Sequence, residues 1–345
     1  MVSIIVPTYN EEKHIATLLE CLLAQDYPQD QLEILIADGR STDRTREIIE
    51  TYCKKYNNIH LLDNPEKFVP TALNRCIEAS KGEIIVRMDA HSGYPRHYVS
   101  TLVKSLKELN AANVGGVWIT EPGADTAEAH AIALSTSDAF GIGNAGYRLG
   151  AEAIAEADTV PYGCFPKTLF ERIGHFDTDM LRNQDDELNG RIIKNGGKIY
   201  LIPDLHIRYY ARPTFKLMRR MYAQYGLFKP LVMLKLGKPA TLRQFAPPAI
   251  VLLHFFAIIS LFISKNLFAI FLLPLALYYS IALYKSITIS TQSYFHQRTL
   301  LFFKLIQAFP MIHFSYGIGY MRGWLKFVIL QQHKKKRTIV VKENR

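Results

Sequence analysis

The spacing of apolar residues changes repeatedly along the N-terminal part of the chain. Short apolar runs, among them VSIIVPT and LEILIAD, are followed by stretches whose apolar residues recur three or four positions apart, as at Ile15, Leu18 and Leu22. Continuous runs of this length are typical of buried strands, and the wider spacing is typical of amphipathic helices. The alternation continues through EIIVRMD and predicts an α/β fold, Rossmann-like, with a mostly parallel sheet flanked by helices.

Polar residues stand where three of the predicted strands end. They are the stretch 7–10, Asp38, and the pair Asp89 and His91. Ligands of open α/β sheets bind beyond the carboxyl ends of the strands, so these residues are expected to share one crevice. Arg87 precedes Asp89 by two positions and shares its strand face. Its expected partner is Asp38, Asp89 or a phosphate, with a buried structural ion pair as an equal alternative.

The middle of the chain predicts further elements of the same domain. NVGGVW is interpreted as a strand, and the Ala- and Gly-rich residues 121–158 as a partly loop-like, mobile lid. Residues 167–204 predict a helix, a loop, a second helix and a strand. The α/β domain therefore extends to about residue 215.

Two long apolar segments follow. They cover 247–263 and 267–284, and Lys265 is the one charged residue from Pro247 to Tyr284. Each is near the minimum length for a helix that crosses a hydrocarbon core of about 30 Å. Their apolar residues cover every helix face, which suits lipid better than a half-exposed surface. We therefore expect a transmembrane helical hairpin, with a buried helix pair of a soluble protein as the alternative.

Basic residues flank this hairpin. The net charge is +10, with nine Lys or Arg and no acid between His206 and Phe245, and a further cluster at 334–337. The positive-inside rule and attraction to anionic lipid place these flanks at the cytoplasmic face of the inner or plasma membrane. We recognise no secretory signal, and four cysteines without metal-binding or pairing pattern fit a reducing compartment. No nucleic-acid partner is expected, because the basic stretches lack a recognisable binding fold.

Residues 300–330 are apolar but interrupted by charges and a proline. A third crossing there would place the basic cluster outside the cytoplasm, so interfacial or re-entrant helices are expected. The predicted domains are an α/β domain at 1–215, a basic amphipathic linker at 216–245, a transmembrane hairpin at 246–284, and interfacial or re-entrant helices with a basic cytoplasmic tail at 285–345.

Four motifs occur along the chain in the order VSIIVPTYNEE, ADGRSTDRT, GEIIVRMDAH and NQDDELNGRI. Together they resemble the family 2 glycosyltransferases, inverting enzymes of the GT-A fold. The form DAHSGYP and the apolar hairpin resemble most the succinoglycan and other exopolysaccharide biosynthesis branch. The resemblance covers residues 1–215 and implies a nucleotide-sugar donor, expected to be a UDP-sugar, and a lipid-linked glycan or polyprenyl-phosphate acceptor.

The resemblance also implies a divalent cation. Asp89 and His91 are similar to the short acidic metal motif of the family, with His91 in place of the more common second Asp. An oxygen and an imidazole ligand favour manganese over magnesium, and the metal stabilises the leaving diphosphate as a Lewis acid. Alternatively, Asp89 alone binds metal and His91 hydrogen-bonds the turn. His206 is the candidate third ligand, with a structural role as its alternative.

Nucleoside binding is implied for Asp38, with a turn or helix-cap role as the alternative, which Asp43 or Ser41 could serve equally well. The family often has a second acid before it, where this chain has Ala37. The other donor-binding candidates that the resemblance implies are Pro7, Tyr9, Glu11, Lys67, Asn74, Arg87 and Asp89.

Inverting transfer needs a base opposite the leaving diphosphate. Asp185 matches the family's acceptor-side "ED" motif, with Gln184 replacing the usual Glu. Asp186 is its main competitor, and acids here could instead serve the N-terminus of a helix. A non-catalytic, nucleotide-sugar-binding membrane scaffold stays open because Gln184 and His91 depart from the usual residues.

We therefore expect a membrane-anchored, metal-dependent inverting glycosyltransferase of exopolysaccharide-type synthesis, or alternatively a polyprenyl-phosphate sugar synthase. The QxxRW signature of processive synthases is missing from RRMYAQYG, which argues against a polymer-extruding channel. Four arginines after the motifs either reach a diphosphate or lipid phosphate, or anchor the chain at the membrane surface. They are Arg208, Arg212, Arg219 and Arg220.

Overall fold

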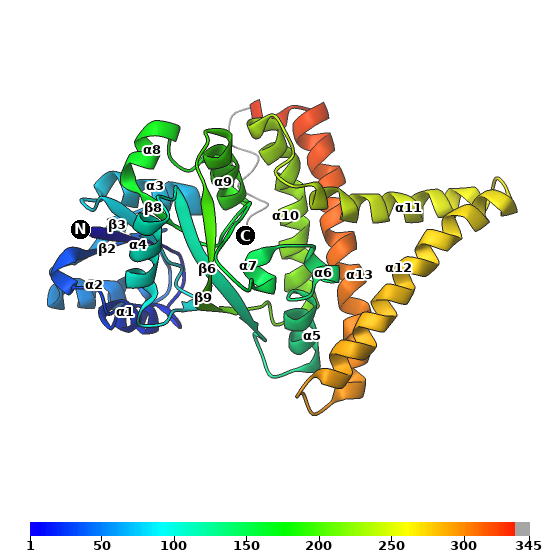
Figure 1. The fold of residues 1–345 in the computed structure, drawn as a ribbon, viewed down its shortest axis with the longest axis horizontal. Coiled ribbons are helices and arrows are strands. Elements are labelled where there is room, and N and C mark those ends of the chain that lie inside the picture. The colour runs from blue at the N-terminus through cyan, green and yellow to red at the C-terminus, as the bar shows by residue number, and fades with distance from the viewer. Residues whose placement is uncertain (335–345) are drawn as a thin grey trace. The chain divides into compact units, whose positions relative to one another are not determined.

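A computed structural model describes residues 1–334 of the protein. The chain forms two compact units (Figure 1). The sheet unit consists of Met1–Ile119 and Gly146–Tyr209. The helical unit consists of Thr120–Ala145 and the described residues from Tyr210 to 334.

Within the described residues the sheet has nine strands, in the order β3-β2-β1-β4-β8-β6-β9-β5, with β7 also paired to β9. The first four strands in this order are parallel to one another. Beyond β4 the pairing becomes mixed, because β8 is antiparallel to β4 and β6. The strands are β1 Val2–Thr8, β2 Leu32–Asp38, β3 Ile59–Asp63, β4 Ile84–Arg87, β5 Ser92–Gly93, β6 Asn113–Glu121, β7 Ala155–Glu156, β8 Cys164–Pro166 and β9 Ile199–Tyr210.

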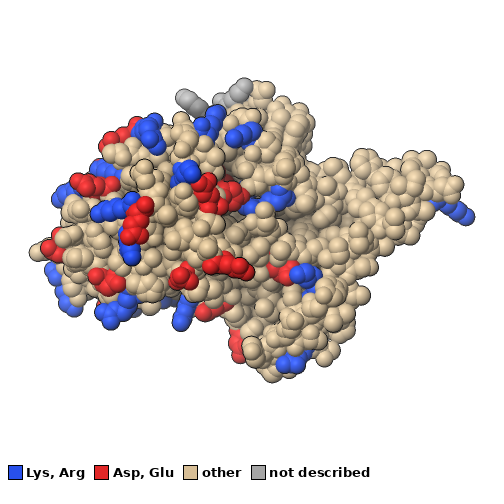
Figure 2. Space-filling view, viewed as in Figure 1, with Lys and Arg blue, Asp and Glu red and all other residues tan. Residues whose placement is uncertain are grey.

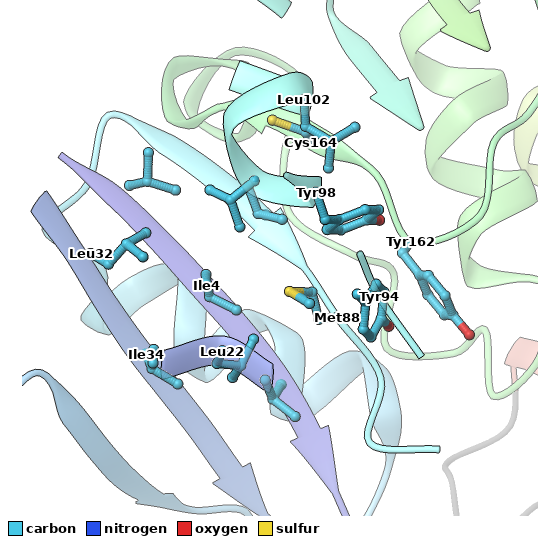
Figure 3. Close-up of a cluster of buried hydrophobic side chains, with 14 of the residues drawn as sticks. Ile4, Leu22, Leu32, Ile34, Met88, Tyr94, Tyr98, Leu102, Tyr162 and Cys164 are labelled. Atoms are coloured by element: carbon cyan, nitrogen blue, oxygen red, sulfur yellow. The ribbon is translucent and has the colours of Figure 1, made fainter. Parts of the chain in front are cut away.

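Helices cover the sheet on both faces, as the predicted α/β fold requires. Alternate residues of β1 point to opposite faces, so that Ile4 joins one core cluster and Ile5 the other. The cluster of Ile4 also contains Leu22, Tyr94 and other side chains (Figure 3). The helices of this unit are α1 Ile15–Leu23, α2 Thr45–Lys55, α3 Val69–Ala79, α4 Tyr98–Glu108, α7 Gly146–Leu149, α8 Lys167–Ile173 and α9 Gln184–Lys194.

The helical unit is built around a third core cluster. Its helices are α5 Ala127–Ser135, α6 Ala139–Ile142, α10 Phe215–Leu236, α11 Ala246–Ser260, α12 Lys265–Gln292 and α13 Arg298–Gly323, followed by a π-helical segment, Trp324–Ile329. Residues 216–245, expected to be a linker, are thus mainly the helix α10. Residues 300–330 form α13 and the π-helical segment, with Leu305, Phe309 and Ile312 buried in the cluster.

The helix α5 lies inside the segment that was expected to be a mobile lid. It buries Ala127, Ala131 and Ile132 in the third cluster, together with residues of α10 and α13. Thr126 caps it by accepting a hydrogen bond from the backbone N–H of Ala129. This part of the expected lid is therefore a packed helix, and the lid expectation is wrong there.

Glycines allow α10 and α13 to pack backbone against backbone (Figure 1). A β-carbon at Gly226 would lie 2.0 Å from the carbonyl oxygen of Tyr316. One at Gly319 would lie 2.2 Å from the carbonyl oxygen of Ala223. Small residues at such positions are the usual means of bringing two helices close together.

Two helical segments are long and apolar enough to cross a membrane by length and composition. They are Leu242–Ser260 and Lys265–Gln292, with mean hydropathies of 1.6 and 2.0. Only 17% of each apolar window is buried inside the protein, so most of these apolar side chains face outward. Figure 2 shows the surface over α11 and the first half of α12 almost free of charge, with Lys and Arg colour at the α11–α12 turn.

Candidate active site

Loops from three neighbouring strands meet at one end of the sheet. Lys67 Nζ lies 5.7 Å from the centre of the Tyr9 ring. Gly39 lies between them, since a β-carbon there would be 3.1 Å from Tyr9 Cδ2 and 3.4 Å from Lys67 Cα. Asn10, Arg40 and Lys67 adopt left-handed backbone conformations, with φ of 55°, 57° and 63°. Such conformations are uncommon for residues other than glycine and gather at functional sites. Tyr9 and Lys67, two of the donor-binding candidates, are thus brought together, and their contact with a donor stays a prediction.

The loop after β1 is tied to the loop after β2. The backbone N–H of Asn10 donates to Ser41 Oγ at 2.8 Å, and that of Thr42 donates to Asn10 Oδ1 at 2.8 Å. The backbone N–H of Glu11 donates to Thr45 Oγ1 at 2.7 Å. These bonds fix Glu11 beside the crevice, while Pro7 lies two residues before the loop, within β1.

Asp38 ends β2 and is fully buried. Its carboxylate accepts hydrogen bonds from the Ser41 backbone N–H at 3.1 Å and from Ser41 Oγ at 2.5 Å. Arg46 Nη1 lies 3.5 Å from the same carboxylate. Asp38 therefore makes the contacts of a turn residue, and its predicted contact with the nucleoside stays a prediction.

Arg87 connects two carboxylates at the centre of the site. It ends β4, is 3% exposed, and binds Asp89 through Nε at 3.1 Å and Nη2 at 3.2 Å. Its third nitrogen, Nη1, donates to Oδ1 of Asp185 at the start of α9. One buried cation therefore holds together two acids that are far apart in the sequence. Of the partners weighed for Arg87, Asp89 is present and Asp38 is not.

The surroundings of Asp185 favour its protonated form. Burial, with the nearby charges of Asp89 and Asp186, raises the pKa of Asp185 to about 6, although Arg87 opposes the shift. The Asp185 side chain is 31% exposed, so one edge of its carboxylate remains accessible. A carboxylate with a pKa near neutrality suits general base catalysis. Burial would lower the pKa of Arg87, but the charges of Asp185 and Asp89 raise it overall.

Two buried tyrosines support Asp89 and the turn after it. The backbone N–H of Asp89 donates to Tyr94 Oη at 2.7 Å. Tyr162 Oη lies 2.6 Å from Ser92 Oγ, and the Tyr162 ring centre lies 5.5 Å from the Arg87 guanidinium. Figure 3 shows the two rings next to each other beyond Met88. Sequence reasoning missed both, although Tyr94 belongs to the DAHSGYP motif.

His91 lies beside Glu11, with Nδ1 3.2 Å from Oε1. His91 and Glu11 thus bring an imidazole and a carboxylate together, and Asp89 lies two residues before His91. Asp89 can accept further bonds beyond those from Arg87, because an ionised carboxylate has about four acceptor positions. The chemistry of Asp89 and His91 therefore fits a divalent cation whose other ligands come from a diphosphate and water.

His206 lies apart from this pair. In the antiparallel register of β5 and β9, Ser92 faces Tyr209 and Gly93 faces Arg208, so β9 runs away from His91 toward His206. Within residues 1–334 no group of three or more His, Cys, Asp or Glu side chains could hold a metal ion. The strand register thus places His206 two residues along β9 from the part that pairs with β5, and its role as a third ligand stays a prediction.

The neighbours of Asp185 have different environments. Glu187 is buried, and its carboxylate binds Arg191 at 2.7 and 2.8 Å, so it is a structural residue. Asp186 is half-buried. Arg191 also donates to the carbonyl oxygens of residues 173, 174 and 175. This arginine, which sequence reasoning missed, fixes the chain before α9.

Asn74, in α3, also fixes the chain before α9. Its side chain donates to the carbonyl oxygen of Phe176 at 2.8 Å and accepts from the backbone N–H of Phe176 at 3.0 Å. Both ends of the amide are thus used to hold the loop between α8 and α9. These bonds give Asn74 a structural role, and its contact with the donor stays a prediction.

Comparison with known proteins gives a consistent result. Residues 3–172 match the sequence model described as Glycosyl transferase family 2. A Methanococcus voltae protein, "Dolichyl N-acetyl-alpha-D-glucosaminyl phosphate 3-beta-D-2,3-diacetamido-2,3-dideoxy-beta-D-glucuronosyltransferase", is 32% identical over 68% of this chain and 74% of its own length. "Succinoglycan biosynthesis protein ExoA" of Rhizobium meliloti is 30% identical over 75% of this chain and 78% of its own length.

The fold of this chain is similar to that of a solved structure. The mannosyltransferase PcManGT from Pyrobaculum calidifontis, solved with GDP-Man and Mn2+, aligns with a TM-score of 0.57 and 22% identity. The alignment covers 89% of this chain and 86% of that one. The mixed sheet and its flanking helices therefore have the GT-A architecture.

Proposed function

Because the chain belongs to glycosyl transferase family 2 and is thus a glycosyltransferase, we propose that it performs metal-dependent, inverting sugar transfer at a membrane. The donor is a nucleotide-diphosphate sugar, for which we propose a UDP-sugar. The acceptor is a lipid-linked glycan of exopolysaccharide-type synthesis. The observation that carries the proposal is the approach of Asp185 to Asp89 through the shared Arg87.

Asp185 is the proposed base. Among the described residues its carboxylate is bonded only by Arg87, at Oδ1, which leaves Oδ2 for the acceptor hydroxyl. The hydroxyl proton moves to Oδ2 as the acceptor oxygen attacks the anomeric carbon, on the side opposite the diphosphate. Arg87 holds the carboxylate in position and balances its charge. Asp186 is the alternative base.

Asp89 and His91 would hold the divalent cation, with manganese favoured by the imidazole. Such an ion stabilises the charge that develops on a leaving diphosphate. The Tyr94 hydroxyl keeps Asp89 in place by accepting a hydrogen bond from the backbone N–H of Asp89. Tyr9 and Lys67 lie at the end of the sheet where the nucleotide of the donor would bind. Pro7, Glu11 and the turn of Asp38 belong to the strand ends and loops of the same region.

The acceptor and the membrane location have separate support. The Methanococcus voltae relative is named for a dolichyl-phosphate-linked sugar, and the other relative for succinoglycan biosynthesis. The outward-facing apolar surfaces of α11 and α12 fit a membrane anchor. The basic residues on both sides of these helices favour a cytoplasmic catalytic unit.

The test uses the full-length protein in detergent or nanodiscs, with manganese and a panel of UDP- and GDP-sugars. Release of the nucleoside diphosphate is measured without acceptor, with bare polyprenyl phosphate, and with a polyprenyl-diphosphate-linked sugar. We expect transfer to the linked sugar, reduced 10²- to 10⁴-fold in Asp185→Asn. Transfer only to bare polyprenyl phosphate would identify a polyprenyl-phosphate sugar synthase instead. Binding of donor without any turnover would support the scaffold alternative.

A further inference from the structure

A groove of about 690 Å³ opens between α10 and α13 in the helical unit. One wall is the N-terminal part of α10, where three basic side chains recur at helical spacing. The other wall is the middle of α13, where the side chains are mostly apolar. The residues that matter here are Lys216, Arg219 and Arg220 from α10, and Met311, Phe314 and Ile318 from α13.

The basic wall carries positive charge that the protein does not neutralise. Lys216, Arg219 and Arg220 are exposed, and none forms an ion pair or hydrogen bond with another residue in 1–334. The acid near this wall, Glu128, bonds the backbone N–H of Phe215 and lies 4.0 Å from Lys304. The groove therefore favours an anion.

The apolar wall restricts which kind of anion the groove binds favourably. Ile318 is 48% exposed, and Met311 and Phe314 are half-buried along the same stripe of α13. A small inorganic anion would gain nothing from this wall, and a neutral lipid would gain nothing from the cations. Two neighbouring arginines suit the oxygens of a phosphate or diphosphate. The combination fits an anionic head joined to a hydrocarbon chain.

The groove also adjoins the beginning of a candidate membrane span. Gly317, next to Ile318, packs against α11, since a β-carbon there would lie 2.5 Å from the carbonyl oxygen of Pro247 and 2.7 Å from Val251 Cγ2. The span Leu242–Ser260 starts at this end of α11. A lipid head in the groove would therefore lie at the level where the span enters the membrane.

We propose that this groove binds the phosphate or diphosphate of the isoprenoid lipid that carries the acceptor. Lys216, Arg219 and Arg220 bind the phosphate oxygens, and the first isoprene units lie along Met311, Phe314 and Ile318. The inference rests on the proposed lipid-linked acceptor, and it adds the site that recognises the lipid. The four arginines left open by the sequence are thereby divided, because Arg219 and Arg220 line this groove.

The experiment measures binding of the full-length protein in phosphatidylcholine nanodiscs that contain a decaprenyl phosphate probe. The variant is Arg219→Gln with Arg220→Gln, and the matched control is Arg298→Gln with Arg322→Gln, two exposed arginines of α13 outside the groove. We expect at least tenfold weaker binding in the groove variant and unchanged binding in the control. A second variant, Ser315→Phe, fills the groove without removing a charge and should also weaken binding.

Three further arms replace the probe with decaprenol, with phosphatidylglycerol, or with inorganic phosphate in solution. Each should bind at least tenfold more weakly than decaprenyl phosphate. Equal binding of phosphatidylglycerol, or equal losses in groove variant and control, would show a general attraction to anionic surfaces and overturn the proposal.

Donor hydrolysis without acceptor, measured on the same samples, should be unchanged in the groove variants. This separates the site from the proposed function. If the protein transfers sugar to a lipid-linked acceptor and the groove variants keep the same KM for it, the site is wrong while the function stands. If binding behaves as expected but no sugar is transferred, the site stands while the function fails.

Discussion

Arg87 shows how a single buried residue can organise a site. A buried cation is unfavourable unless its charge is balanced, and here Asp89 and Asp185 provide two negative charges for one positive. The excess negative charge and burial raise the pKa of Asp185 to about 6. The same arrangement would attract a divalent cation near Asp89.

This pKa gives a prediction at the scale of the residue. A base must be deprotonated to accept a proton, so the transfer rate should fall as pH drops through about 6, approaching tenfold per pH unit. The measurement is kcat for transfer between pH 5 and 8 at saturating donor. Asp186→Asn is the control, because it removes the neighbouring acid and leaves the proposed base in place.

The profile of Asp186→Asn should keep the same shape, with its midpoint moved slightly downward, because Asp186 contributes to raising the pKa of Asp185. A rate that stays constant from pH 7 to pH 5 would show that Asp185 is not the base. The same would follow if the pH dependence of the rate disappeared in Asp186→Asn.

Some of these contacts follow from the sequence and others do not. Arg87 and Asp89 are two apart on a strand end, so their shared face follows from the twofold period of a strand. Asp185 lies 98 residues from Arg87 in the sequence, and only its resemblance to a family motif indicated a role in the site. Tyr162 comes just before β8, the strand that pairs with β4, and its position depends on its own left-handed backbone conformation, with φ of 60°, which no periodicity reveals.

At the scale of the element, the strands of the parallel half, and also β6 and β9, were predictable from the sequence, and the short strands were not. The runs that form β1, β2 and β4 are continuous and apolar, whereas β8 has only three residues, too few for a pattern. The helix α5 was not predicted, because the alanines of this segment were treated like its glycines, as residues typical of loops. Alanine is the best helix former, and Thr126 with Glu128 provided an N-terminal signal.

The packing of α10 on α13 also has a signal in the sequence. Gly319 and Gly323 form a G-x-x-x-G pattern, and both meet backbone atoms of α10. We predict that Gly319→Ala lowers the free energy of unfolding by about 1–3 kcal/mol through overpacking, despite the better helix propensity of alanine. Thermal unfolding of the full-length protein in detergent measures this. Gly146→Ala is the control, because its β-carbon would meet only Leu201 Cδ2, at 3.4 Å.

The control should unfold within about 0.5 kcal/mol of the parent protein. An equal effect of both substitutions would mean that the close approach of α10 and α13 does not contribute to stability. A loss confined to Gly319→Ala would also make it a tool for loosening the groove between these helices.

At the scale of the whole molecule, the two candidate spans have the length and composition of membrane-crossing helices. Soluble proteins rarely expose continuous apolar surface. The apolar windows of both spans are only 17% buried, and Figure 2 shows few charged residues over α11 and the first half of α12. If these helices cross the membrane as a hairpin, their connecting turn around Lys265 lies on the outer side. Residues after α12 then lie on the same side as the catalytic unit.

This topology is testable with one added cysteine at a time and a membrane-impermeant maleimide on intact cells, with labelling counted above that of the parent chain. We predict that Asn266→Cys, beside the α11–α12 turn, is labelled from outside, because it follows the first crossing. Gln297→Cys, between α12 and α13, should be labelled only after the cells are permeabilised, because two crossings return the chain to the cytoplasm. The parent chain is the control, since its four cysteines all lie in the sheet unit and should be protected in intact cells. Labelling of the parent chain from outside would reverse the orientation and place sugar transfer on the other face. Protection of Asn266→Cys in intact cells, with labelling after permeabilisation, would mean that α11 and α12 do not cross the membrane.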